Sequence, residues 1–114
     1  MNVPASNKFL YFAVDGDNAA MFPASQFRGG YLDADDSLVL QFRDFDSLTN
    51  GAPDAHVEIT VSNETHKAVL EAIANEIAFG NSAFVVVADD DADVFLTSNI
   101  ASCDAIDIDL NAAA

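Results

Sequence analysis

Short apolar segments separated by polar turns recur along the chain and predict a β-rich fold. Residues 9–14 and 83–88 are apolar at every position, which is the pattern of strands buried on both faces. Residues 56–61 alternate between apolar and polar positions without exception, and residues 38–43 do so except at Val39, as half-buried strands do, and we expect the two segments to pair antiparallel. Residues 106–110 alternate isoleucine or leucine with aspartate, and predict a last strand with one face in solvent.

One segment, residues 63–79, has the period of an α-helix. Its apolar stripe recurs at 3.6-residue spacing and consists of Val69, Leu70, Ile73 and Ile77. We expect Asn63 to cap the first turn and Gly80 to follow the last one. The stripe predicts that one side of this helix covers a sheet.

The segments between these elements are predicted as loops. Residues 19–30, with apolar side chains around Pro23 and two glycines at the end, indicate an ordered loop or a single helical turn. Residues 44–53 indicate a wide connection between two strands, and no repeat or domain boundary is visible. The prediction is one α+β domain over residues 1–114, mostly an antiparallel β-sheet or small sandwich covered by one α-helix at about residues 63–79.

The net charge narrows the classes of partner. The chain has 114 residues, of which 19 are Asp or Glu and four are Lys or Arg, giving a formal charge of −15. A field of this sign repels phosphate backbones and anionic lipid surfaces, so we expect neither nucleic-acid nor membrane binding. No apolar run approaches the about 20 residues of a membrane span, and the N-terminus lacks the pattern of a signal peptide. We expect a protein that stays soluble in the cytoplasm where it is made.

The acidic run near the end of the chain is the one candidate for a metal site. Asp89, Asp91 and Asp93 have the spacing of the first three ligands of a calcium loop. The sixth position of that loop is Val94 instead of glycine, and the twelfth is Ile100 instead of glutamate. These departures exclude an EF-hand and leave a weak cation site beside the simpler interpretation, a solvated acidic turn. We expect no bound metal and no other cofactor.

No arrangement of residues points to catalysis. His56 and His66 can approach each other, because the predicted strand leads into the helix, yet no zinc-site spacing or cysteine partner accompanies them. Cys103 is the single cysteine and has an acidic neighbour, Asp104, which disfavours a thiolate and indicates a packing residue. Acid–base work by paired carboxylates needs a desolvated cleft, whereas the acids here lie in polar turns. We therefore expect no catalytic residues and a protein that is not an enzyme.

The phenylalanines suggest contact with another protein. Nine are present, and three fall in predicted loops: Phe22, Phe27 and Phe45. Apolar residues in loops either cover the core or meet another protein. The three residues are therefore candidate interface residues, and they favour self-association into a homo-oligomer.

The order of several segments resembles a group of small acidic proteins encoded by marine tailed bacteriophages, cyanophages especially. The segments that carry the resemblance are 9–12, 21–25, 65–69, 84–90 and the C-terminal stretch from Ile100 to Ala114. The 46–54 loop and Cys103 do not fit it. The resemblance implies a virion structural protein, assembled in the host cytoplasm with other virion proteins and with itself, and it brings no catalytic or ligand residue.

Two functions follow as hypotheses. The first is a virion component, either a capsid decoration (cement) protein or a neck or tail piece, that acts by assembly contacts. The second is a soluble accessory phage protein that binds a host protein through its acidic surface, as a nucleic-acid mimic does. The second predicts that the aspartates of residues 89–93 align with Asp33, Asp35 and Asp36 at a spacing similar to that of phosphates.

Overall fold

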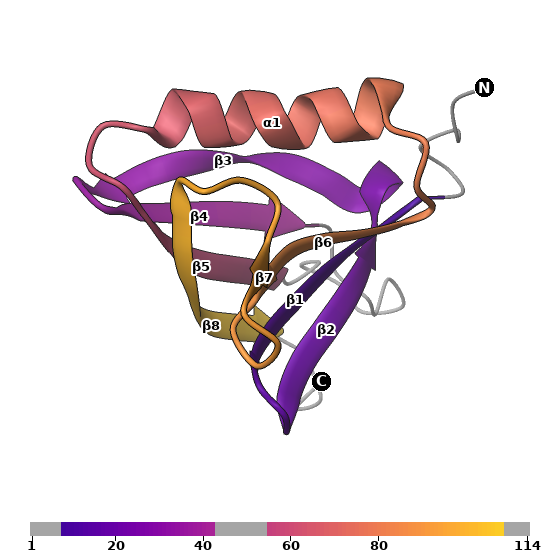
Figure 1. Cartoon of the computed structure of the whole chain (residues 1–114), viewed down its shortest axis with the longest axis horizontal. Helices are drawn as coiled ribbons and strands as arrows, with labels where there is room; N and C mark the ends of the chain where they lie inside the picture. Colours follow the sequence, from indigo (N-terminus) through magenta and orange to yellow (C-terminus); the bar gives the residue numbers. More distant parts are fainter. Residues whose placement is uncertain (1–7, 43–54, 109–114) are drawn as a thin grey trace, which may run out of the picture.

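The computed structural model of the chain describes residues 8–42 and 55–108, which form two four-stranded sheets and one α-helix (Figure 1). Sheet A has the order β2-β1-β6-β7, with bounds Asn18–Pro23, Phe9–Asp15, Phe84–Asp89 and Val94–Phe95. Sheet B has the order β3-β4-β5-β8, with bounds Phe27–Ala34, Ser37–Phe42, Ala55–Val61 and Ile100–Ile108. The helix, α1, spans His66–Phe79. Among the described strands, β1 and β6 pair in parallel and the other pairs are antiparallel. This confirms the α+β prediction, with two packed sheets and one helix.

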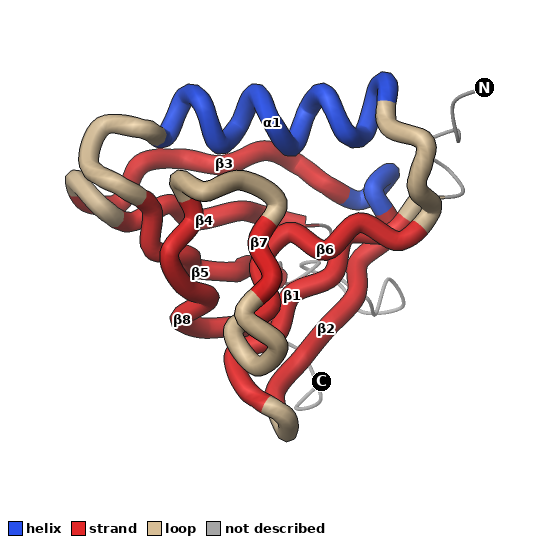
Figure 2. The backbone as a smooth tube through the Cα atoms, viewed as in Figure 1, coloured by secondary structure: helices blue, strands red, loops and turns tan. Residues whose placement is uncertain are grey.

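The helix lies along β3, at one side of sheet B (Figures 1 and 2). Val69 and Ile73 of the predicted stripe are buried, and Leu70 and Ile77 pack against the same core. Gly30 in β3 permits this close approach, because a Cβ atom there would lie 2.9 Å from Leu40 and 3.1 Å from Leu70. The apolar stripe was therefore a correct guide to how the helix packs.

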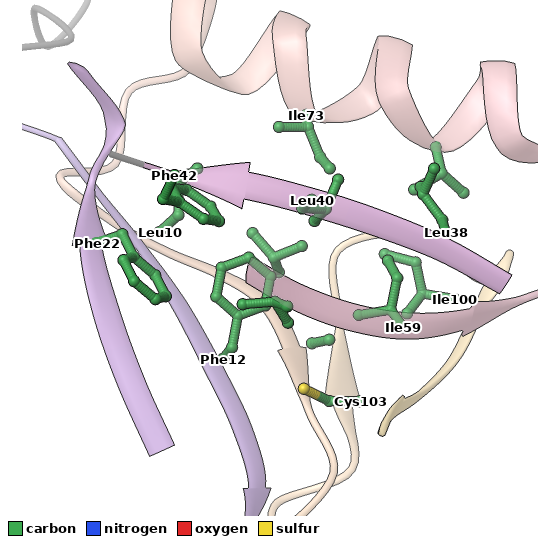
Figure 3. Close-up of a cluster of buried hydrophobic side chains, with 14 of the residues drawn as sticks. Leu10, Phe12, Phe22, Leu38, Leu40, Phe42, Ile59, Ile73, Ile100 and Cys103 are labelled. Atoms are coloured by element: carbon green, nitrogen blue, oxygen red, sulfur yellow. The ribbon is translucent and has the colours of Figure 1, made fainter. Parts of the chain in front are cut away.

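Aromatic rings fill the space between the sheets near β1, β2 and β4 (Figure 3). Phe22 stacks on Phe42 with ring centroids 4.2 Å apart, and Phe12 meets both rings edge-on at 6.0 and 5.7 Å. Phe27 adds a tilted contact with Phe42 at 5.4 Å. Such offset and edge-to-face pairs contribute beyond the apolar area that they bury. Phe42 touches the other three rings and is therefore central to the core.

A buried lysine holds the C-terminal end of α1. Lys8 is fully buried, and its ammonium donates hydrogen bonds to the carbonyls of Glu76, Ile77 (3.1 Å) and Gly80 (3.2 Å). The last carbonyls of a helix have no partner within the helix and carry partial negative charge, so a cation there is favourable. This contact fixes the end of the helix to the start of β1.

The prediction that Asn63 caps the N-terminus of the helix is wrong. The helix begins at His66 with Thr65 as its N-cap, and no side chain caps the first turn. Asn63 lies within a tight turn from Ser62 to Thr65, in which Glu64 has φ 63° and the Thr65 N–H and hydroxyl both donate to the Ser62 carbonyl. The first turn is stabilised by the packing of its apolar side instead of by a cap.

Two predicted boundaries also need correction. Residues 19–30 are not mainly a loop: they contain most of β2, a 3₁₀ turn at Ala24–Gln26 and the start of β3 (Figure 2). Strand β8 begins at Ile100 instead of 106, and its register with β5 shifts between Cys103 and Ala105. A bulge of this kind adds one residue, here Asp104, and breaks the alternation by which a strand is recognised. The predicted connection at 44–53 lies outside the described residues.

Candidate functional site

The two histidines lie apart. His56 pairs in register with Gln41 of β4, and its Nε2 lies 3.5 Å from Asp107 Oδ2. His66 Nε2 donates to the carbonyls of Ala34 (3.0 Å) and Ser37 (3.2 Å), at the opposite end of β4. The histidines are thus held by different parts of sheet B and do not approach each other. His66 connects the helix to the β3–β4 turn.

The acidic run forms a turn that uses its own carboxylates. Asp89 Oδ1 accepts hydrogen bonds from the backbone N–H groups of Asp91 (3.1 Å) and Ala92 (2.9 Å), as aspartate often does in tight turns. Asp93 has φ 61° and ends the turn. Within residues 8–42 and 55–108, no three His, Cys, Asp or Glu side chains converge as metal ligands do. The three candidates Asp89, Asp91 and Asp93 therefore shape the turn between β6 and β7.

Cys103 lies in the core and is not poised to act as a nucleophile. Cys103 belongs to β8 of sheet B, and its side chain is buried in the core (Figure 3). Burial, together with the charges of Asp104, Asp90 and Asp89, raises the pKa of the thiol to about 12. A nucleophilic cysteine needs a lowered pKa and access to solvent. The structure thus places Cys103 as a packing residue.

This pKa gives a prediction for alkaline solution. Below pH 9 the thiol is protonated in the folded and unfolded chains alike, so the shift has no effect. Between pH 9 and about 12 the unfolded thiol ionises while the folded thiol keeps its proton, so the free energy of unfolding falls as pH rises. Urea unfolding across this range should show a steeper fall for the natural chain than for Cys103→Ala. Equal slopes in the two chains would contradict the assignment.

The three candidate interface phenylalanines have different outcomes. Phe22 is in β2, with no exposed surface, and belongs to the core, so its assignment to an interface is corrected. Phe27 begins β3 and packs partly buried against Phe42. Phe45 lies outside the described residues. An apolar residue in a predicted loop was a poor signal here, because the segment around Phe22 is a strand.

A different set of apolar residues lies on the outer face of sheet A. Leu10, Phe12 and Val85 point into the core, and the alternation of strands turns their neighbours outward. The strand registers arrange the outward residues in two rows across β2, β1 and β6: Pro23, Phe9 and Phe84 in one row, and Met21, Tyr11 and Val86 in the other. We call these six residues the sheet A patch.

The sheet A patch is open to solvent. Met21 is 44% exposed and Phe84 is 49% exposed, while the other four residues are partly exposed. Tyr11 and Phe84 touch diagonally, with ring centroids 5.1 Å apart. The next row along the strands, Ala19, Ala13 and Asp89, ends the patch with a carboxylate. Contiguous exposed apolar surface on a small protein often marks an interaction site.

The acidic residues gather at one end of the sheet A patch. The β1–β2 turn carries Asp15 and Asp17, and the β6–β7 turn carries the aspartates of residues 89–93. The turns are neighbours, because a Cβ atom added at Gly16 would lie 3.6 Å from Asp91 Oδ1. We call Asp15, Asp17, Asp89, Asp90, Asp91 and Asp93 the acidic end.

The alignment of two acidic clusters that a nucleic-acid mimic requires is not formed. Asp33, Asp35 and Asp36 belong to the β3–β4 region of sheet B, whose turn lies far from the β6–β7 turn (Figure 1). The neighbour of the 89–93 aspartates is instead the β1–β2 turn. The negative charge is therefore divided between separate turns.

Comparison of the chain with protein families, curated proteins and solved structures finds no match. No helix in the described part of the chain has the length and apolar character needed to cross a membrane. The sheet A patch and the acidic end are therefore interpreted from their own chemistry.

Proposed function

We propose that this protein is a structural component of a phage particle, a capsid decoration protein or a neck or tail piece, that acts through assembly contacts. The observation that carries the proposal is the sheet A patch. Strands β1 and β6 are apolar on both faces, as strands covered on both sides are, yet the outer face carries the half-exposed Phe84, and within residues 8–42 and 55–108 the core packs against the other face. A second protein that covers the outer face would bury the apolar side chains that β1 and β6 expose there.

The remaining chemistry agrees with an assembly role. The single cysteine is protonated in the core, the histidines are separated, and the Asp89 carboxylate accepts hydrogen bonds from the backbone of the β6–β7 turn. The resemblance of residues 9–12, 21–25 and 84–90 to phage proteins covers the very strands that form the patch. In a particle with repeated sites, a small contact per copy suffices when neighbouring contacts act together.

Mass spectrometry of purified virions tests this proposal. The experiment uses particles of the phage that encodes the chain, purified by density gradient, with the infected-cell lysate as the reference. We expect the protein to be enriched in the particles together with the capsid or tail proteins, in many copies per particle. Its presence in the lysate and absence from the particles would refute the proposal and favour the accessory protein that binds a host protein.

A further inference from the structure

The sheet A patch and the acidic end form one continuous surface with one sign of charge. Strands β1, β2, β6 and β7 contain no lysine, arginine or histidine. The apolar rows end at Asp89, and the exposed carboxylates of Asp15, Asp17 and Asp91 follow directly. A partner that covers this surface contacts apolar side chains over the sheet A patch and negative charge at the acidic end.

We infer that this surface docks a protein whose own surface presents apolar side chains with lysine or arginine beside them. The inference rests on the assembly role proposed above and names the chemistry of the partner. Apolar contact with Met21, Tyr11 and Phe84 supplies the affinity. Pairing of the acidic end with lysine or arginine fixes the orientation and speeds association.

A second copy of the chain fits this surface less well. Each copy carries a formal charge of −15, and sheet A offers no cation to the acidic end of another copy. If two patches met with their strands parallel, the acidic ends would face each other and repel. If the strands ran in opposite directions, each acidic end would lie against uncharged residues and gain nothing. Charge complementarity therefore favours a different, basic protein.

Binding of a basic partner and binding of a second copy of the chain depend on salt concentration in opposite ways. Salt shortens the range of charge interactions, from about 10 Å at 0.1 M to about 3 Å at 1 M. A basic partner binds less tightly as salt increases, because attraction is screened. Self-association strengthens as salt increases, because repulsion between copies is screened.

The experiment uses a random library of displayed 12-residue peptides, selected on the full chain at low salt. We expect the enriched peptides to combine apolar residues with lysine or arginine. Binding of the strongest peptide should fall about tenfold on Phe84→Ser or Met21→Ser, since exposed anchor residues carry most of the affinity of a contact. It should fall about threefold or more on the double change Asp15→Asn and Asp17→Asn, and in high salt. The change to asparagine keeps the Oδ1 acceptor that Asp15 offers to the Asp17 N–H.

Matched controls come from sheet B. Tyr31→Ser is the control for Phe84→Ser, because each ring is 49% exposed, and Leu32→Ser is the control for Met21→Ser. The double change Asp33→Asn and Asp35→Asn removes the same charge at the β3–β4 region. These controls should bind as the natural chain does, and thermal unfolding verifies that every variant is folded.

Three results would overturn the inference. They are enriched peptides without lysine or arginine, equal losses on the controls, and sedimentation of the chain alone as a dimer that Phe84→Ser dissociates. Absence of the chain from virions, with peptide binding as expected, would refute the particle role and leave the docking surface standing.

Discussion

Replacing Phe42 by alanine is expected to lower the free energy of unfolding by about 3–5 kcal/mol, the usual range for a large aromatic residue in a core. Phe42 is fully buried and contacts the rings of Phe12, Phe22 and Phe27. Its removal leaves a cavity between the sheets and ends three aromatic contacts at once. A loss of this size is a large share of the about 5–15 kcal/mol that domains possess.

Urea unfolding followed by circular dichroism measures this effect. The control is Phe79→Ala, because Phe79 is 68% exposed at the end of α1 and its truncation should change stability by less than about 0.5 kcal/mol. Similar values for the two variants would mean that Phe42 is not at the centre of the core.

Replacing Lys8 by methionine is expected to lower the free energy of unfolding by about 2 kcal/mol. The substitution keeps a long apolar side chain but removes the donor for the carbonyls of Glu76, Ile77 and Gly80. Those partly buried carbonyls then lose the ammonium donor, although the Glu76 carbonyl keeps its hydrogen bond from the Gly80 N–H, and the favourable charge at the helix C-terminus is lost. Relief from burying an ammonium group offsets part of this loss, which is why the expected value is moderate.

The matched control for this change is Lys67→Met on the exposed side of the same helix. Lys67 lies in the first turn, where a cation has no favourable interaction with the helix dipole, so its loss should be nearly neutral. Thermal unfolding and urea unfolding of both variants give the comparison. A Lys8→Met chain as stable as the natural one would show that the three hydrogen bonds only balance the cost of burying the charge.

The helix and β5 could be predicted because their side chains follow one period without interruption, whereas β4, expected to be half-buried, is buried on both faces, with Val39 only 7% exposed. Val57, Ile59 and Val61 alternate with polar residues, and the stripe that contains Val69 and Ile73 repeats every 3.6 residues. Each pattern has one buried side and one wet side, so the sequence alone identifies the element and its orientation.

Strands β2 and β3 could not be predicted in the same way. Each lies at the edge of its sheet, and β2 places only Phe22 fully in the core. Two alanines in β2 and two glycines in β3 give little hydrophobic signal. The pairing of an edge strand is decided by its neighbour, which a single-chain pattern does not identify.

The sheet A patch could not be predicted from the sequence because β1 and β6, unlike β2 and β3, are strongly apolar. Residues 9–14 and 83–88 are apolar throughout, and this pattern predicts strands with both faces covered. The structure corrects that prediction, since Tyr11 and Val86 are partly exposed and Phe84 is half exposed. A sequence records that a face is apolar, but not whether the same chain or a partner covers it.

The most direct test of the proposed function compares three forms of the chain in virions. Cells infected with a phage that lacks the natural copy are supplied with the natural chain, Phe84→Ser or Tyr31→Ser, and the purified particles are quantified by mass spectrometry. We expect incorporation of the natural chain and Tyr31→Ser at equal levels, with Phe84→Ser reduced about tenfold, as expected for loss of an anchor residue. Equal incorporation of all three forms, or equal loss of both variants, would contradict the proposed function.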